Sequence, residues 1–223
     1  MNSTFMFGED KFGENEDFSI YYKKIGGQLS STEINNTIRI IYDYLAELYP
    51  KEDYRENFPT LKESIDKLFK NKFSKQEEIN IINTFAFHEL GVIPKEYVEA
   101  LITLNKYFIL SVVIDIWSPK DAWIKTFEKH NINKLFIASS FSSDCRMVKP
   151  SPKPFKNVVE QLNIPKDKCL IIGDSIRRDL GGAINVGIDC VLVDGKKNTN
   201  ALASFDNLLE FTKEIIIQIP IKR

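Results

Sequence analysis

The hydrophobic and polar positions divide the chain into two stretches with different periods. Between residue 17 and about residue 90, apolar residues recur every three or four positions, which is the spacing of amphipathic helices. Several helix starts in this stretch carry a serine or threonine followed three residues later by glutamate, at Ser30, Thr60 and Ser74. The longest helix is marked by Ile34, Ile38, Ile41 and Leu45. The pattern predicts a small helical bundle without strands.

From residue 93 onward, short continuous apolar runs alternate with helical patterns. Apolar runs of this length are typical of strands that are buried on both faces of a parallel sheet. The alternation therefore predicts an α/β protein with a doubly wound parallel sheet. The elements expected are strands within 108–114, 135–139, 169–172 and 190–193, a weak strand at 4–7, a last helix at 201–212 and a final strand near the edge at 214–219.

The stretch CLIIGDSIRRDLGGAINVGIDCVLVDG carries the strongest chemical signal. Its first strand stops at Gly173, and a tight turn then puts Asp174 at the carboxyl end of the strand, where parallel sheets bind their ligands. Asp179 follows at the start of a short helix. Two carboxylates so placed are suited to share a hard cation, above all Mg²⁺, which prefers oxygen ligands. The residues alone leave an alternative, in which Asp174 caps the helix and Asp179 is a solvated helical residue.

Composition narrows the class of protein. The 223 residues include 30 basic and 31 acidic side chains, so the charge balance offers no argument for binding nucleic acid or a membrane. No apolar run approaches the length of a membrane span, and the N-terminus lacks the basic start and apolar centre of a signal peptide. The three cysteines are interpreted as reduced thiols of a cytoplasmic protein.

Two motifs resemble those of the haloacid dehalogenase-like hydrolases. The GDS turn, the aspartate after it and the GGA helix leading to Gly187 are similar to the last motif of that superfamily. The run KPSPKPF, which begins at Lys149, matches its KPxPxxF context. The resemblance implies that Asp174 and Asp179 hold Mg²⁺. It also implies that Lys149 neutralises the phosphoryl group and the attacking carboxylate at the reacting centre.

The same resemblance implies the domain organisation, whereas the expected substrate contacts depart from the family pattern. The expected fold is a Rossmann-like parallel sheet core formed by 1–16 and 91–223, with an α-helical cap inserted at 17–90 that selects the substrate. The strand position that normally carries a serine or threonine is Ile114, which offers no hydroxyl to a phosphate. The substrate contacts expected instead are Asp115, Trp117 and Ser118, the last of which is also the expected cap of the helix that follows.

The start of the chain departs from the superfamily pattern. There the nucleophile lies in a DxD motif after the first strand, where the first carboxylate attacks phosphorus and the second serves as acid and base. No DxD occurs near this N-terminus. One alignment places Gly8 at the nucleophile position and Asp10 at the acid/base position. The other treats the first seventeen residues as the linker that follows the motif, with the first strand encoded upstream of Met1.

A missing first strand has a structural consequence. In this fold it lies between the strands expected at 108–114 and 169–172, so its absence leaves two parallel strands facing a gap, at a cost of about 1–3 kcal/mol for each buried unpaired backbone group. Three outcomes stay open: residues 3–7 fill the gap, the two strands pair directly, or the isolated chain is poorly stable.

Two functions from different classes follow. By resemblance, the chain is a hydrolase, a Mg²⁺-dependent phosphatase for a small phosphate monoester of a metabolite, with its nucleophile motif missing or truncated. The competing hypothesis is a non-catalytic domain of the same fold that binds metal, phosphate or a protein partner. Lys149, Asp174 and Asp179 favour the first hypothesis, whereas Ile114 and the absent DxD favour the second.

Overall fold

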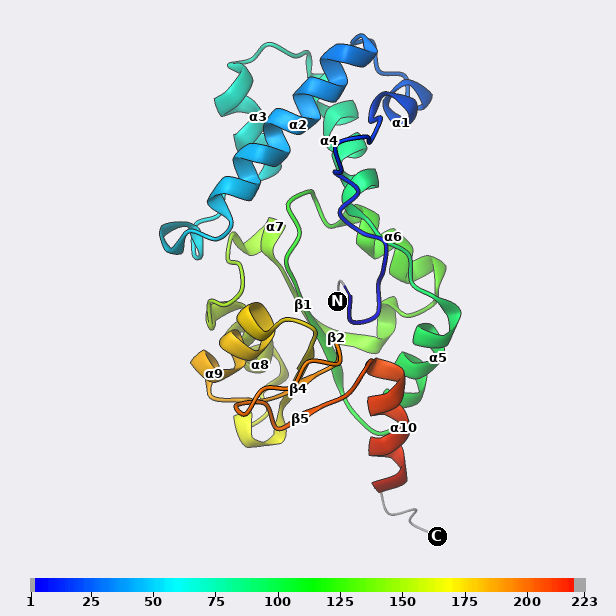
Figure 1. The fold of residues 1–223 in the computed structure, drawn as a ribbon, viewed down its shortest axis with the longest axis vertical. Coiled ribbons are helices and arrows are strands. Elements are labelled where there is room, and N and C mark those ends of the chain that lie inside the picture. Colours follow the sequence, from blue (N-terminus) through cyan, green and yellow to red (C-terminus); the bar gives the residue numbers. More distant parts are fainter. Residues whose placement is uncertain (1–2, 219–223) are drawn as a thin grey trace.

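The computed structural model describes residues 3–218, and Figure 1 shows a helical lobe above an α/β lobe. The upper lobe consists of α1 (Ser19–Lys24), α2 (Ser31–Leu48), α3 (Leu61–Phe69) and α4 (Lys75–Glu89), with a 3-10 turn at Glu52–Tyr54. No strand occurs between residues 19 and 89 of the described chain. The division into a core and an inserted cap agrees with this picture, and its exact boundaries stay a prediction.

The helix starts in the upper lobe follow the expected capping pattern. Ser30 and Thr60 each accept a hydrogen bond from the backbone N–H three residues later, and the glutamates at those positions bond back to the backbone, so both are complete capping boxes. Ser74 accepts from the Glu77 backbone, but the Glu77 side chain turns away to accept bonds from Tyr22 and Gln28. The apolar face of α2 is fully buried, through Ile34, Ile38, Ile41 and Leu45.

The lower lobe is an α/β core with parallel strands, as the alternation predicts. β1 (Leu110–Ile114) pairs in parallel with β2 (Phe136–Phe141), and β3 (Leu170–Gly173) pairs in parallel with β4 (Asp189–Leu192), which also pairs with β5 (Ala203–Ser204). The helices of this lobe are α5 (Lys95–Leu104), α6 (Asp121–Lys129), α7 (Ser142–Cys145), α8 (Lys153–Leu162), α9 (Gly181–Val186) and α10 (Leu208–Gln218), with a π-helical turn at Ile176–Leu180 and 3-10 turns at Asn133–Leu135 and Lys166–Lys168.

Several local predictions are wrong. The last helix begins at Leu208 rather than at residue 201, because residues 203 and 204 pair with β4 as β5. The strand expected at 214–219 is instead the end of α10 as far as Gln218, and residue 219 lies outside the described chain. Ser118 does not cap a helix, since α6 starts at Asp121 and the Ser118 hydroxyl is bonded elsewhere.

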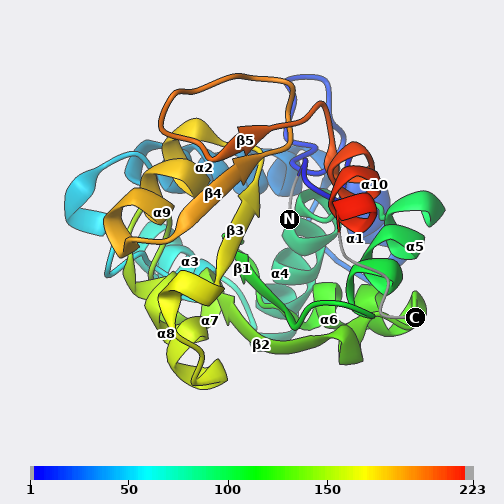
Figure 2. The same ribbon diagram turned by 90° about the horizontal axis from the view of Figure 1, so that it is seen from below.

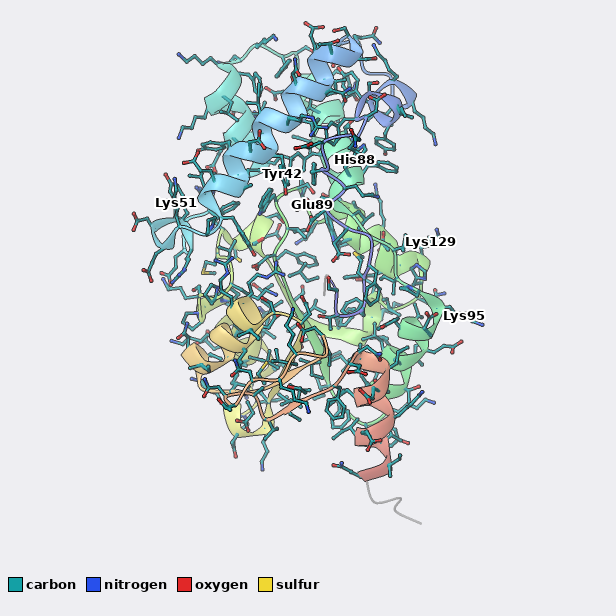
Figure 3. All side chains as sticks on the ribbon, in the orientation of Figure 1. Tyr42, Lys51, His88, Glu89, Lys95 and Lys129 are labelled. Atoms are coloured by element: carbon teal, nitrogen blue, oxygen red, sulfur yellow. The ribbon has the colours of Figure 1, made fainter. Side chains whose placement is uncertain are left out.

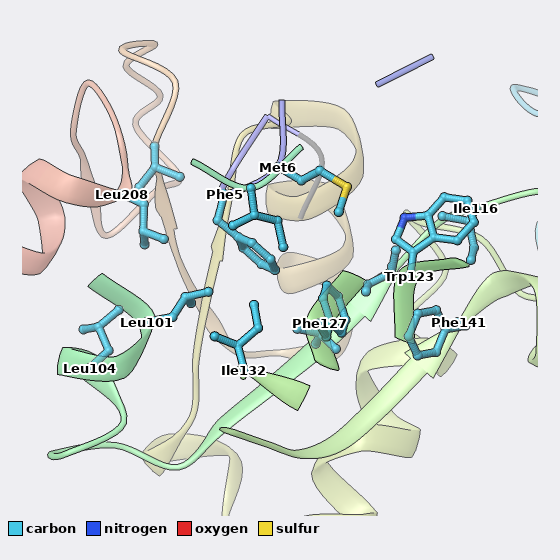
Figure 4. Close-up of a cluster of buried hydrophobic side chains, with 14 of the residues drawn as sticks. Phe5, Met6, Leu101, Leu104, Ile116, Trp123, Phe127, Ile132, Phe141 and Leu208 are labelled. Atoms are coloured by element: carbon cyan, nitrogen blue, oxygen red, sulfur yellow. The ribbon is translucent and has the colours of Figure 1, made fainter. Parts of the chain in front are cut away.

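The N-terminal residues pack into the core without forming a strand of the sheet. Phe7 makes one isolated antiparallel bridge, to Val92, so the strand expected at 4–7 does not form. Phe5 and Met6 are nevertheless buried in the main hydrophobic cluster, where the Phe5 ring stacks on Phe136 with 6.0 Å between centroids. Figure 4 shows Phe5 and Met6 beside Phe127 and Trp123 of α6. Trp123 is fully buried.

A gap separates the two halves of the core. Among the described residues β1 pairs only with β2 and β3 only with β4, so the facing edges of β1 and β3 have no strand between them. Figure 2 shows β1 and β2 on one side of the core and β3, β4 and β5 on the other. The space is a cavity of about 540 Å³, lined by 108–113 on one side and 168–172 on the other. Neither direct pairing of the strands nor filling by residues 3–7 has occurred.

The described chain contains no helix with the length and apolar character needed to cross a membrane. Cys145, Cys169 and Cys190 are all free thiols.

Candidate active site

Lys149 and Asp179 form a buried ion pair at the carboxyl ends of the strands. Lys149 Nζ lies 2.7 Å from Asp179 Oδ1, and each side chain is only 7% exposed. The second oxygen of Asp179 accepts a bond from the Ser175 backbone N–H at 3.0 Å. Burial, the largest single influence, acts to raise the pKa of Asp179, but the charge and hydrogen bond of Lys149 and the carboxylate's other favourable interactions, the Ser175 N–H among them, together lower it. Burial likewise acts to lower the pKa of Lys149, which Asp179 and Asp115 together raise.

Asp115 joins this pair to the helical lobe. Its Oδ2 accepts a bond from the Lys149 backbone N–H at 3.0 Å and another from the Tyr49 hydroxyl at 2.6 Å, while its buried Oδ1 has no hydrogen-bond partner among residues 3–218. Burial raises the pKa of Asp115, with Lys149 opposing the shift. Tyr49 ends α2, so the helical lobe contributes a hydroxyl directly to the polar cluster at the end of β1. Burial, and then the Asp115 carboxylate, hold the Tyr49 pKa well above its usual range and keep that hydroxyl a donor.

Asp174 lies in the turn after β3 and faces a different pair of partners. Its Oδ1 accepts a bond from the Thr4 hydroxyl at 2.9 Å, and its Oδ2 lies 3.8 Å from Arg178 Nη2. The cap of the helical turn that follows is Ser175, whose hydroxyl accepts a bond from the Arg178 backbone. Asp174 therefore does not cap this helix, which was the alternative role considered for it from the sequence. The N-terminal segment and the GDS turn meet at this carboxylate.

Asp10 adds a carboxylate at the junction of the two lobes. The residue is accessible to water yet closely surrounded by protein atoms, so that burial, followed by the charge of Glu9, raises the pKa of Asp10 to about 6. Arg178 acts in the opposite direction on the same carboxyl, which puts Asp10 within electrostatic reach of the cation beside Asp174. A carboxyl with this pKa is suited to give and take protons near neutral pH.

Glu89 was not predicted from the sequence. It ends α4 where the lobes meet (Figure 3), is buried, and accepts bonds from the Trp117 and Ser118 backbone N–H groups at 2.6 and 2.9 Å. The Ser118 hydroxyl also donates to Glu89. Burial raises the pKa of Glu89 to about 7 in spite of these donors. A glutamate at the end of a helix is ordinarily a surface residue, so nothing in the sequence indicates this one.

Ser118 and Trp117 make contacts within the protein, and their expected contact with a substrate stays a prediction. The Ser118 side chain is fully buried and its hydroxyl donates to Glu89. The Trp117 ring packs into the aromatic cluster of the helical lobe, with its centroid 5.5 to 6.4 Å from those of Tyr42, Tyr49, Phe58 and Phe85. Tyr49, which was not singled out from the sequence, joins the cluster through Asp115, and Arg178 joins it beside Asp174.

Comparison with protein families identifies the chain. The family model described as haloacid dehalogenase-like hydrolase matches residues 30–193, well over half of the sequence. The chain belongs to the haloacid dehalogenase-like hydrolases. The superfamily inferred from the GDS and KPxPxxF motifs is therefore confirmed, and both motifs lie inside the matched range.

The individual proteins that resemble this chain have low sequence identity to it. A glyceraldehyde 3-phosphate phosphatase of Pyrococcus furiosus is 27% identical over 154 residues, which span 67% of this chain and 62% of that protein. The fold is similar to that of a phosphatase of the family from Thermococcus onnurineus (TM-score 0.55, 20% identity, 89% of this chain and 86% of the other). It is also similar to that of a 2-haloacid dehalogenase from Pseudomonas syringae (TM-score 0.64, 14% identity, 97% and 95%).

The carboxylates of Asp174 and Asp179 are the right kind of ligand for a divalent cation, but too few of them are grouped together. Oxygen ligands are what Mg²⁺ prefers. However, both oxygens of Asp179 and one of Asp174 already accept hydrogen bonds from the protein. Across residues 3–218, no group of three or more acidic, histidine or cysteine side chains is placed to hold a metal ion. The described residues therefore do not form the complete magnesium site that the family resemblance implies.

Proposed function

We propose that this chain carries the phosphate-binding residues of a magnesium-dependent phosphatase acting on a small phosphorylated metabolite. The observation that carries the proposal is the convergence of Lys149, Asp115, Asp174 and Asp179 at the carboxyl ends of β1 and β3. A buried ammonium beside several carboxylates is an arrangement that stabilises charge developing on a transferred phosphoryl group.

Each residue has a proposed role. Lys149 neutralises the phosphoryl oxygens, and Asp179 holds the ammonium in place by the 2.7 Å ion pair. Asp115 fixes the backbone of Lys149 and, through Tyr49, the position of the helical lobe above the site. Asp10, with its raised pKa, exchanges the proton of the leaving group. Asp174 and Asp179 are the proposed ligands of Mg²⁺, as the resemblance implies.

The relatives support the reaction class. The Pyrococcus furiosus relative is a glyceraldehyde 3-phosphate phosphatase, and phosphate-ester hydrolysis is accordingly the reaction proposed for this chain. Because the match spans only 62% of that protein, the substrate itself is not carried over. A cytoplasmic location is proposed from the free thiols.

Residues 1–223 contain no DxD motif near the N-terminus, and Asp10 takes the acid/base role rather than that of the attacking group. Nucleophilic catalysis divides one difficult step into two easier ones, so loss of the attacking carboxylate removes that route. We therefore expect residues 1–223 to hydrolyse phosphate monoesters at or near background with Mg²⁺ present. Weak Mg²⁺ binding is expected for the same reason, because the two carboxylates alone do not complete a site.

The experiment is a phosphate-release assay on two proteins. One is the chain as it stands, and the other carries a strand ending in DxDxT ahead of Met1. Turnover in the extended protein that disappears when the first aspartate of the added motif becomes asparagine supports the proposal, and Lys149→Met should abolish it as well. Robust activity of the short chain that is lost in Asp10→Asn would mean that Asp10 itself attacks phosphorus and that the proposed division of roles is wrong.

The competing function is a non-catalytic domain that binds phosphate, metal or a protein partner. The observation that favours it is the internal pairing of the acidic groups, since three of the four carboxylate oxygens of Asp174 and Asp179 accept hydrogen bonds within the protein. Calorimetric titration with Mg²⁺ and with inorganic phosphate separates the two. Phosphate binding that survives Lys149→Met, together with an inactive extended protein, would support the non-catalytic function.

A further inference from the structure

Arg178 places a positive charge at the junction of the two lobes. It belongs to the π-helical turn that follows the GDS turn, and its side chain is 33% exposed. Burial acts to lower the pKa of Arg178, but Tyr49 and two neighbouring aspartates raise it, so the guanidinium stays charged. Because Tyr49 ends α2, this charge lies where the helical lobe meets the carboxyl ends of the strands.

The guanidinium of Arg178 is only loosely paired within the protein. Its closest carboxylate among residues 3–218 is that of Asp174, whose Oδ2 lies 3.8 Å from Nη2, beyond hydrogen-bond distance. The other oxygen of Asp174 accepts a bond from the Thr4 hydroxyl. A guanidinium carries five N–H donors in a planar fork, which fits a carboxylate with two parallel bonds. Arg178 therefore keeps donors that an anion between the lobes can use.

Asp179 links this cation to Lys149 without neutralising it. Asp179 is the residue after Arg178 in the chain, and its Oδ1 accepts a bond from the Lys149 ammonium at 2.7 Å. Its Oδ2 accepts a bond from the Ser175 backbone N–H, so both of its oxygens already have partners other than Arg178. The charges of Arg178 and Lys149 are close enough to act on each other. One small molecule with two anionic groups can therefore contact both cations.

We propose that Arg178 determines substrate specificity by binding a carboxylate of the substrate, whose phosphoryl group lies at Lys149. The substrate class is then a small phosphorylated carboxylic acid. A carboxylate suits the site better than a second phosphate, because its single charge is repelled less by Asp174, 3.8 Å from the guanidinium. The inference rests on the proposed function, since that function places the phosphoryl group at Lys149.

The probes are non-hydrolysable phosphonates in two matched sets, titrated calorimetrically into the full chain without added metal, which these probes chelate. Phosphonoacetate and 3-phosphonopropionate carry a carboxylate, and ethylphosphonate and propylphosphonate carry a methyl group in its place. At least one carboxylate probe should bind about tenfold more tightly than its matched alkyl probe, because it forms charge-assisted bonds with the guanidinium. The carboxylate probe with the larger gain indicates the spacing between the two cations.

Substitutions at two adjacent arginines provide the matched test. Arg178→Met should remove the gain and leave the affinity for the alkyl probes unchanged, whereas Lys149→Met should weaken binding of both sets. Arg177→Met removes the same charge from an exposed side chain that lies over the Tyr49 ring, 5.9 Å from its centroid, and should keep the gain. If Arg178→Met fails to fold, Arg178→Lys, which keeps the charge but not the fork, should lose most of the gain.

Several results would overturn the proposal. They are equal affinities of the native chain for the matched probes, a gain that persists in the Arg178 variant, and a gain that is lost equally in Arg177→Met. In each of these cases the alkyl probes still bind, so the proposed phosphate site at Lys149 stands and only the carboxylate site is wrong. If no phosphonate binds, the phosphate site itself is wrong, and the carboxylate site that rests on it is wrong as well.

Discussion

Replacing Lys149 by methionine removes one charge from the buried pair with Asp179 and keeps a side chain of similar length. The two groups are 2.7 Å apart and 7% exposed, so Asp179 cannot regain water when its partner is lost. Removing one member of such a pair typically costs about 3–5 kcal/mol. That is a large part of the roughly 5–15 kcal/mol that stabilises a domain. We therefore expect Lys149→Met to lower the free energy of unfolding by about 3–5 kcal/mol.

The assay is urea denaturation followed by circular dichroism at pH 7, with a double-mutant cycle. The double variant Lys149→Met with Asp179→Asn should lose less stability than the sum of the single changes, because no buried charge is left unpaired. Lys153→Met is the control, since Lys153 pairs with Glu56 at the surface and is worth less than about 1 kcal/mol. A cost below about 1 kcal/mol for Lys149→Met, or additive single changes, would refute the reasoning.

The contribution of this pair to stability also has a defined pH window. The pKa of Asp179 is lowered in the folded protein, so its contribution is present above the ordinary carboxyl pKa and is lost as pH falls through the lowered value. The pKa of Lys149 is raised, so its contribution is present below the ordinary lysine pKa and is lost as pH rises through the raised value. The difference between the native chain and Lys149→Met should therefore be greatest between about pH 5 and 9 and shrink outside that range.

Two further predictions concern other buried positions. The Glu89 pKa of about 7 lies above that of an unfolded glutamate, so ionisation costs more in the folded state and the free energy of unfolding should fall as pH rises from 5 to 8. Glu89→Gln keeps an acceptor for Ser118, and urea titrations should show that it flattens this fall. An equally steep fall in the variant would contradict the assignment. Gly182→Ala should lower the free energy of unfolding by about 1–3 kcal/mol, because the added methyl would lie 2.4 Å from the Phe155 ring. Gly13→Ala is the control, since a methyl there meets open space. Equal thermal melting temperatures of the two variants would refute the packing argument.

Local physics explains what could be predicted from the sequence. Hydrogen bonds between a cap side chain and a backbone three residues away depend on neighbours in the chain, so the capping boxes at Ser30 and Thr60 were predictable. Gly187 has φ +72°, as its place after a helix requires. Strands β1 to β4 could likewise be located, because each is a short, nearly continuous run of apolar residues. A strand buried on both faces has apolar side chains on both sides, so apolar and polar residues do not alternate along it. Asp179 was singled out from its place near the end of a strand, and Lys149 from the resemblance.

The tertiary structure decided which elements meet. Short segments without a strong period depend on long-range partners, so residues 203 and 204 became a strand only because β4 offers an edge. Glu89 and Tyr49 entered the site because the helical lobe packs against the ends of the strands, and no spacing along the chain encodes that contact. The cavity between β1 and β3 is likewise a property of the assembled core. The missing first strand predicted a gap at this place, but strand pairing is non-local, so only the fold shows that β1 and β3 do not pair with each other or with residues 3–7.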